Sequence, residues 1–289
     1  MDNTLHITSG DRAGELLAEA RLPGDILVWH DLLYEGPRAA GWPEDDTLRQ
    51  RALFIEQMTA GGLAQDEVLR TFSDQYKRIL MLPEDTEIVL WFDACLFDQS
   101  MLVHLLSCFD HRGLTRNVQL LCIDRFPGIE RFIGLGQLGP EQLLSKYHTR
   151  QPVSGSQFLF ANKVDRVFAE KDLVMAGTLS VQDDAPIRWI PAAMKRWLQE
   201  QPDPGTGLGR LETMALEAVR QGCRKPWDIF NHAAAAETPP QFWGDTTLWA
   251  KINGLADRNP PLVRIEGPET RLPQWLGEVN LQEFEITPC

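Results

Sequence analysis

Polar side chains with catalytic or metal-binding potential follow three short apolar segments of this chain. The segments are Leu5 to Thr8, Ile26 to Trp29 and Ile88 to Phe92. The polar residues that follow them are Ser9, Gly10, Asp11, His30, Asp31, Glu35, Asp93, Asp98 and Gln99. If the segments are neighbouring parallel strands, these side chains converge at one edge of a sheet, where ligands of open α/β folds bind. The spacing therefore predicts a shared site at the carboxyl ends of the strands.

Several carboxylates in one pocket repel each other unless a cation, a proton or an arginine neutralises them. Their oxygens suit Mg²⁺ or Mn²⁺, which are often shared with a substrate phosphate. We expect Asp93 and Asp98 to hold such a metal, and His30, at a strand end beside a carboxylate, to move a proton. The full expectation is catalytic His30, Asp31 and Glu35, ligand-binding Ser9, Gly10, Asp11, Arg51 and Gln99, and metal-binding Asp93 and Asp98.

A purely structural role is open for most of these residues. Asp11 and Asp98 could each cap a helix by accepting hydrogen bonds from free backbone N–H groups. Asp31 and Glu35 could hold the loop that follows the second segment. Arg51 could neutralise the acidic cluster or lie in solvent. Three carboxylates with separate local partners would need no ligand.

The elements that would position these residues can be identified from the hydrophobic pattern. Ile88 to Trp91 are four apolar residues without polar alternation, which is typical of a strand buried on both faces of a parallel sheet. Two strands joined by a helix over Ala13 to Arg21 come first, and Val118 to Ile123 is a fourth strand after the helix that contains Met101. We expect an α/β class with a Rossmann-like parallel sheet.

Domain boundaries follow from composition and from the breaks in periodicity. We expect a Rossmann-like domain over residues 1–150 and a helical connector over 151–200 that packs on it, with breaks at 183–186 and at Pro191. The Pro- and Gly-rich run 201–207 is typical of a linker. Three helices and then a strand at Leu262 to Glu266 predict a winged-helix-like domain over 208–289.

Charge and cysteine content exclude several classes of protein. The net charge is −13, and residues 210–266 hold seven basic and seven acidic side chains, so a nucleic-acid partner is not expected. Five cysteines form no CxxC pair, which favours reduced thiols. No signal peptide and no apolar run of about 20 residues is visible, so we expect a cytoplasmic protein without membrane contact.

Other common site motifs are absent. Ser9-Gly10-Asp11 lacks the three glycines of a dinucleotide loop and the lysine of a phosphate loop. There is no GxSxG turn of a serine hydrolase and no Cys/His zinc spacing. Gly134-Leu135-Gly136 suits either a phosphate-binding loop or an ordinary tight turn.

Several fragments resemble a known family. Leu5 to Asp11, Trp29 to Pro37, Trp91 to Asp93 with Leu96 to Gln99, and Gly134 to Leu138 are similar to the bacterial domain-of-unknown-function eighteen-thirty-five family. Leu211-Glu212 and Phe242 to Thr246 resemble the small domain commonly appended to it. The family pattern has Arg where this chain has His30, and Glu-His-Asp where it has Asp93-Ala94-Cys95. The resemblance covers nearly the whole chain but implies no established activity.

Two functional hypotheses result. The first is an enzyme that binds a nucleotide or another phosphate-bearing ligand with a divalent metal at the strand ends. The alternative is a non-catalytic ligand sensor or adaptor that acts through protein contacts, in part through the carboxyl-terminal domain, and the departure at Asp93-Ala94-Cys95 favours it. A DNA-binding regulator is the weakest reading.

Overall fold

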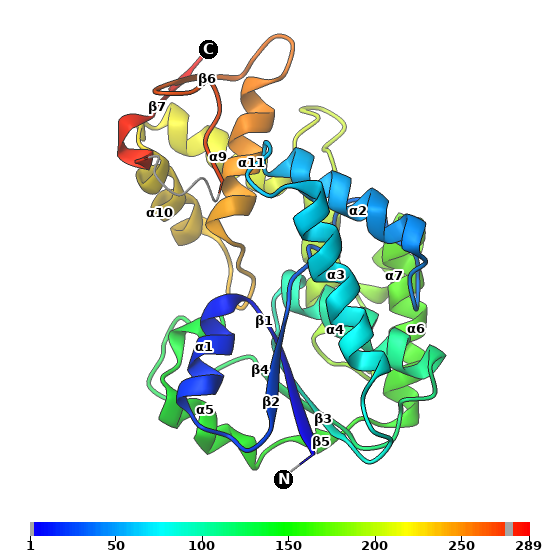
Figure 1. Ribbon diagram of the computed structural model, residues 1–289. Helices are drawn as coiled ribbons and strands as arrows, with labels where there is room; N and C mark the ends of the chain where they lie inside the picture. Colours follow the sequence, from blue (N-terminus) through cyan, green and yellow to red (C-terminus); the bar gives the residue numbers. More distant parts are fainter. Residues whose placement is uncertain (1–2, 275–279) are drawn as a thin grey trace. The chain divides into compact units, whose positions relative to one another are not determined.

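The computed structural model describes residues 3–274 and 280–289, and its internal contacts divide the chain into two compact units (Figure 1). Unit 1 comprises Met1–Arg51, Leu69–Lys195 and Pro239–Gln241. Unit 2 comprises Ala52–Val68, Arg196–Thr238 and Phe242–Cys289. Each unit is therefore assembled from segments that are far apart in the sequence.

Unit 1 is built on a five-stranded sheet with the order β2-β1-β3-β4-β5. Its strands are β1 (Thr4–Ser9), β2 (Asp25–Trp29), β3 (Glu87–Asp93), β4 (Val118–Ile123) and β5 (Gln151–Pro152). The first four pair in parallel and β5 pairs antiparallel to β4. The predicted α/β class and parallel sheet are confirmed, and the short antiparallel edge strand β5 is an addition.

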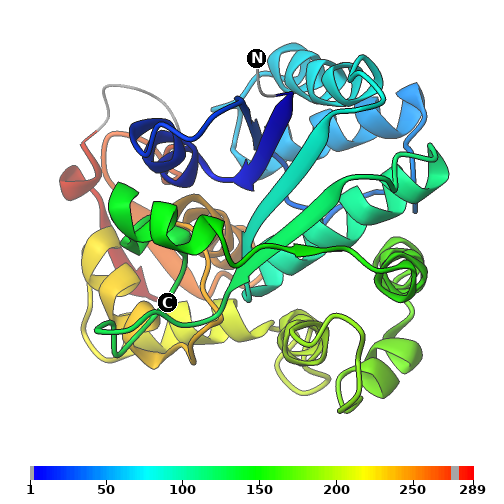
Figure 2. The same cartoon turned by 90° about the horizontal axis from the view of Figure 1, so that it is seen from below.

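Helices cover both faces of this sheet (Figure 2). On one side, α1 (Asp11–Glu19) and α5 (Pro140–Tyr147) lie over the sheet, and Leu16, Leu17 and Leu143 pack against Val89, Trp91, Leu121 and Ile123. On the other side lies α4 (Leu96–His111), in which nearly every residue is buried. Burial from both sides explains why β3 has an apolar sequence without polar alternation.

The remaining helices of the first 200 residues are α2 (Asp45–Met58), α3 (Gln65–Leu80), α6 (Gly155–Glu170), α7 (Leu173–Leu179) and α8 (Ile190–Glu200). Unit 1 extends through Lys195, so it includes α6, α7 and the first half of α8, and α6 packs against α4. The predicted interruption of the helical pattern is found over residues 180–189, between α7 and α8. Pro191 is the second residue of α8, where the missing N–H has no intrahelical partner to lose.

Unit 2 contains three helices followed by an antiparallel hairpin. They are α9 (Arg210–Arg220), α10 (Pro226–Ala236), α11 (Asp245–Ala256), β6 (Val263–Glu266) and β7 (Glu285–Pro288). Leu216, Ile229, Trp249 and Phe284 belong to its core. The predicted succession of helices and strand is confirmed at this level.

The predicted linker at 201–207 is an ordered turn. The Asp203 carboxylate accepts hydrogen bonds from the backbone N–H groups of Gly205 and Thr206 at 2.9 and 3.0 Å. These bonds hold the pKa of Asp203 below its usual range. Within residues 3–274 and 280–289, no helix is both long and apolar enough to cross a bilayer.

Candidate functional site at the strand ends

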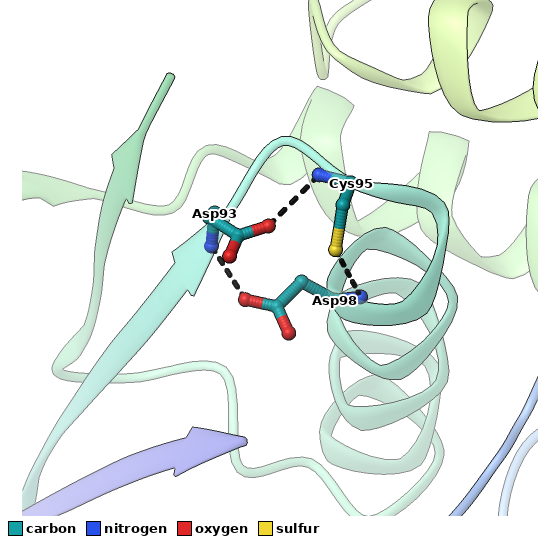
Figure 3. A group of neighbouring side chains, drawn as sticks. All are labelled: Asp93, Cys95 and Asp98. Carbon is teal, nitrogen blue, oxygen red and sulfur yellow. Dashed lines mark hydrogen bonds between the residues drawn. The ribbon is translucent and has the colours of Figure 1, made fainter. Parts of the chain in front are cut away.

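The turn between β3 and α4 gathers Asp93, Cys95 and Asp98 (Figure 3). The Asp93 backbone N–H donates to Asp98 Oδ2 at 2.6 Å, and the Cys95 N–H donates to Asp93 Oδ1 at 2.9 Å. The Cys95 sulfur accepts from the Asp98 N–H at 3.5 Å and caps α4. One potential ligand atom from each of the three side chains lies within 4.8 Å of the other two. The predicted metal-binding residues Asp93 and Asp98 thus lie together. The Cys95 thiol beside them was not among the predicted ligands.

Ser9 and Gln99 complete this cluster from neighbouring elements. Ser9, the last residue of β1, donates its hydroxyl hydrogen to Asp98 Oδ1. The Gln99 amide nitrogen donates to the Asp93 carbonyl at 2.6 Å and contacts Cys122 Sγ at 3.4 Å. Its amide oxygen is buried and has no hydrogen-bond partner among the described residues. This buried acceptor could therefore accept a hydrogen bond from a ligand or a water molecule.

Burial controls the charge of this cluster. Asp93 is 7% exposed and Asp98 is 2% exposed. Burial raises the pKa of Asp93 to about 6, although hydrogen bonds from Cys95 and from the Leu135 N–H act in the opposite direction. Burial, and then the neighbouring Asp93 charge, raises the pKa of Asp98 well above its usual range. Both carboxyl groups therefore hold a proton more readily than a solvent-exposed aspartate does, and a bound cation would replace that proton.

The loop at Gly134 closes over the Asp93 carboxylate. Gly134 has a φ of 149°, and a Cβ added there would lie 2.7 Å from Asp93 Oδ2. The glycine is required because the backbone approaches a side-chain oxygen closely. The glycine loop, for which the sequence suggested either a phosphate or an ordinary turn, thus approaches the Asp93 carboxylate.

His30 and Asp11 form a second, exposed group at the ends of β2 and β1. His30 Nε2 lies 2.7 Å from Asp11 Oδ1, with the two side chains 47% and 77% exposed. The predicted helix cap at Asp11 is wrong, because Gly10 occupies the N-cap position of α1 and no side chain caps this helix. A Cβ at Gly10 would meet nothing within 4 Å, so the space beside this turn is open.

Asp31 and Arg51 form a third group that is buried and structural. The Arg51 guanidinium binds both oxygens of Asp31 and also donates to the carbonyls of Leu32, Glu35 and Pro37. This clamp fixes the loop after β2, with Glu35 contributing its backbone oxygen. Asp31 also accepts from the Leu32 N–H at 2.7 Å. For Asp31 and Arg51 the loop-holding alternative is the one the geometry supports.

The structure thus distributes the predicted site residues over three groups rather than one. Asp98 is not the cap of α4, since Cys95 holds that position and the Asp98 carboxylate accepts from Ser9 and Asp93 instead. The Asp93–Asp98 pair and the His30–Asp11 pair both adjoin β1. The register places Ser9 opposite Trp29, which directly precedes His30. Adjacent strands lie about 4.8 Å apart, so the two pairs lie at the same edge of the sheet.

Two features at or near this edge were not anticipated. Gln241 binds the β3–α4 turn: its amide oxygen accepts from the Leu96 N–H at 2.8 Å and its amide nitrogen donates to the Ala94 carbonyl at 3.3 Å. The residues 239–241 belong to unit 1. Nothing in the local sequence indicates this contact, because Gln241 lies 145 residues from Leu96.

A buried polar network also lies behind α4. Arg38 binds Asp165 and lies 3.1 Å from His104 Nδ1, and Tyr76 Oη lies 2.6 Å from His104 Nε2. Asp165 also accepts from the Gly41 N–H at 2.7 Å. Burial lowers the pKa of His104 well below its usual range, so this histidine is neutral. The network ties the loop after β2 to α4 and α6 and is closed to solvent, which indicates a structural role.

The chemistry of the donor set favours some cations over others. The two carboxylates suit Mn²⁺ and the thiol suits Zn²⁺, whereas Mg²⁺ prefers oxygen ligands only and keeps several waters. Asp93, Asp98 and Cys95 would be the ligands, and Ser9 would orient Asp98 from outside.

No protein-family model matches this chain, and no curated protein sequence matches it either.

Proposed function

We propose that the protein binds a divalent cation at Asp93, Cys95 and Asp98 and, through it, a small phosphate-bearing ligand at the carboxyl edge of β1, β2 and β3. The observation that carries this proposal is the burial of two carboxylates against each other with a thiol in reach. An uncompensated pair of buried carboxylates is costly, and a cation removes that cost.

Three features support a phosphate-bearing ligand beside the cation. The first turn of α1 has no side-chain cap, so its backbone N–H groups are available to an anion. The turn at Gly10 is open. His30, held against Asp11 at 2.7 Å, is exposed and could give or accept a proton at the ligand.

The cation is tested first, by titrating the protein with MnCl₂ and following the electron paramagnetic resonance signal of free Mn²⁺, with ZnCl₂ followed by calorimetry. We expect one binding site, and a loss of affinity of about tenfold or more in Asp93→Asn and in Asp98→Asn. Asp74→Asn is the matched control, since Asp74 is an exposed carboxylate on α3. Equal binding by all four proteins, or no binding of either ion, would contradict the proposal.

The ligand is tested on the metal-loaded protein with a panel of nucleoside mono-, di- and triphosphates by calorimetry. Binding that requires Mn²⁺ and weakens in His30→Ala supports the proposed site. Binding that is unchanged without metal would place the ligand elsewhere.

We also propose that α9, α10, α11 and the β6–β7 hairpin form a winged-helix-like arrangement suited to protein contacts. The equal numbers of acidic and basic residues over 210–266 do not favour a phosphate backbone. Membership of the domain-of-unknown-function family also remains a proposal, and the proposed activity does not depend on it.

A further inference from the structure

The outer edge of β4 borders a hollow of about 480 Å³ within unit 1. Six consecutive residues, 120–125, line it, which is the pattern of a strand seen from its edge. The opposite wall comes from the end of α5, from β5 and from residues 186–189.

Part of this strand edge has no paired strand among residues 3–274 and 280–289. The strand β5 pairs only with Gln119 and Leu120, so the last residues of β4 extend beyond it. The Val118 carbonyl accepts from Val153 on the β5 side, whereas the Asn117 carbonyl accepts from Ile88 of β3. Backbone groups of successive strand residues point to opposite sides, so those of Cys122 point outward with those of Val118, and Asp124 follows directly after the end of β4. Neither residue makes an outward backbone hydrogen bond within the described part of the chain.

The rim of the hollow is positively charged in a protein of net charge −13. Its lining contains three basic residues, Arg125, Lys146 and Arg188, and one acidic residue, Asp124. Asp124 is occupied by Arg188 Nη2 at 3.1 Å and by the Trp189 indole N–H at 2.9 Å. In the described residues no carboxylate pairs with the Lys146 ammonium, which lies 5.1 Å from the centre of the Phe126 ring.

We propose that this hollow binds an acidic, extended peptide segment of a partner protein, which adds to the sheet as a strand beside residues 122–124. Pairing with a strand satisfies both the free N–H and the free C=O groups, whereas a small anion would leave the carbonyls without donors. Acidic side chains on the peptide would meet the basic rim. The unpaired end of β4, residues 121–123, is about 10 Å long, which matches the three central residues of a five-residue peptide.

The test uses the ¹⁵N-labelled full-length protein and the peptide acetyl-Glu-Val-Glu-Val-Glu-amide. We expect the amide resonances of Cys122 and Asp124 to shift on titration and their hydrogen exchange to slow. The same peptide with both valine nitrogens methylated should bind about tenfold more weakly or worse, because it cannot complete the ladder. If the Cys122 and Asp124 amides do not respond at saturating peptide, the proposal is overturned.

Charge is tested by the double variant Lys146→Glu, Arg188→Glu, which should lose at least about tenfold in affinity at low salt. Lys77→Glu, an exposed site on α3, is the matched control and should bind as the parent does. Far-ultraviolet circular dichroism of the double variant establishes that it is folded. Equal binding of a Lys-Val-Lys-Val-Lys peptide, or displacement of the acidic peptide by inorganic phosphate at equal concentration, would instead indicate a non-specific or small-anion site.

Discussion

Asp98 accepts hydrogen bonds from a hydroxyl group and an amide in a turn where it has almost no contact with water. Asp93, its neighbour, accepts from two backbone N–H groups. Burial raises the pKa of both carboxyl groups. Raised pKa values in a buried pair of carboxyl groups are typical of sites that hold a proton or a cation.

The raised pKa of Asp93 makes stability depend on pH. Its folded pKa of about 6 exceeds the ordinary value of 3.8, so protons bind more tightly to the folded state. The stabilisation is complete below about pH 4 and is lost as the pH rises through about 6, by about 3 kcal/mol in total. We expect urea unfolding at a series of pH values to show this decline in the parent.

Asp93→Asn is the comparison for this measurement. Its free energy of unfolding, subtracted from that of the parent, should leave a difference that falls between pH 4 and pH 7. A constant difference over that range would show that the Asp93 pKa is not raised. Added Mn²⁺ should restore stability to the parent above pH 6 if the proposed cation site is correct.

Several residues of the candidate site could be predicted from the sequence, whereas the residues they bind could not. The end of a strand can be recognised from a few residues, so Ser9, Asp93 and Asp98 were selected. The partner of Asp98 is 89 residues away, and that of Arg38 is 127 residues away. An aspartate near the start of a helix has the same neighbouring sequence whether it caps that helix or, like Asp98, accepts a hydrogen bond from a distant hydroxyl group. Only the fold distinguishes the two roles.

At the level of elements, the strands β1 to β4 and most helices agree with their predicted ranges. The spacing of apolar residues in the strands differs clearly from that in the helices, so the two kinds of element can be told apart in the sequence. The strand β5 was missed because Gln151 and Pro152 have little strand propensity and are held by β4. Its short length is what leaves the β4 edge open.

The turn between α2 and α3 shows how closely elements of unit 2 pack. A Cβ on Gly62 would lie 1.8 Å from the Gln274 carbonyl oxygen. We expect Gly62→Ala to destabilise the protein by about 1–3 kcal/mol in denaturant unfolding, because backbone must shift to relieve the clash.

Gly177→Ala is the matched control for Gly62→Ala. Gly177 lies in α7 with nothing within 4 Å of the added Cβ, so alanine should be neutral or stabilising by about 0.5–1 kcal/mol. Equal effects of the two substitutions would show that the contact between Gly62 and Gln274 is absent in solution.

For the whole molecule, the sequence predicts three consecutive regions, whereas the contacts give two units built from interleaved segments. Amino-acid composition indicates a domain boundary only where the composition itself changes along the chain, as it does at the Pro- and Gly-rich run. It contains no signal that the segment Ala52–Val68 joins the carboxyl-terminal unit, since that depends on contacts such as Gln274 Nε2 to the Met58 carbonyl at 3.2 Å.

This interleaving predicts the behaviour of a fragment of residues 1–203. The segment 52–68 loses its partners in unit 2, so its amide hydrogens should exchange faster than in the full chain. The amides of β1 and β3 should retain protection, because the strands that pair with them, β2 and β4, lie within residues 1–203. Hydrogen exchange followed by mass spectrometry distinguishes the two regions, and equal protection of 52–68 in both proteins would contradict the division.

The uncovered edge of β4 also bears on solubility. Free strand edges promote the sideways association of identical chains, and natural proteins often guard them with lysine and arginine. If two copies met along this edge, Arg125, Lys146 and Arg188 of one would approach the same residues of the other. The repulsion would keep two copies of the chain apart at physiological ionic strength. An acidic segment would be attracted instead, so the same three side chains would both prevent self-association along this edge and favour an acidic partner.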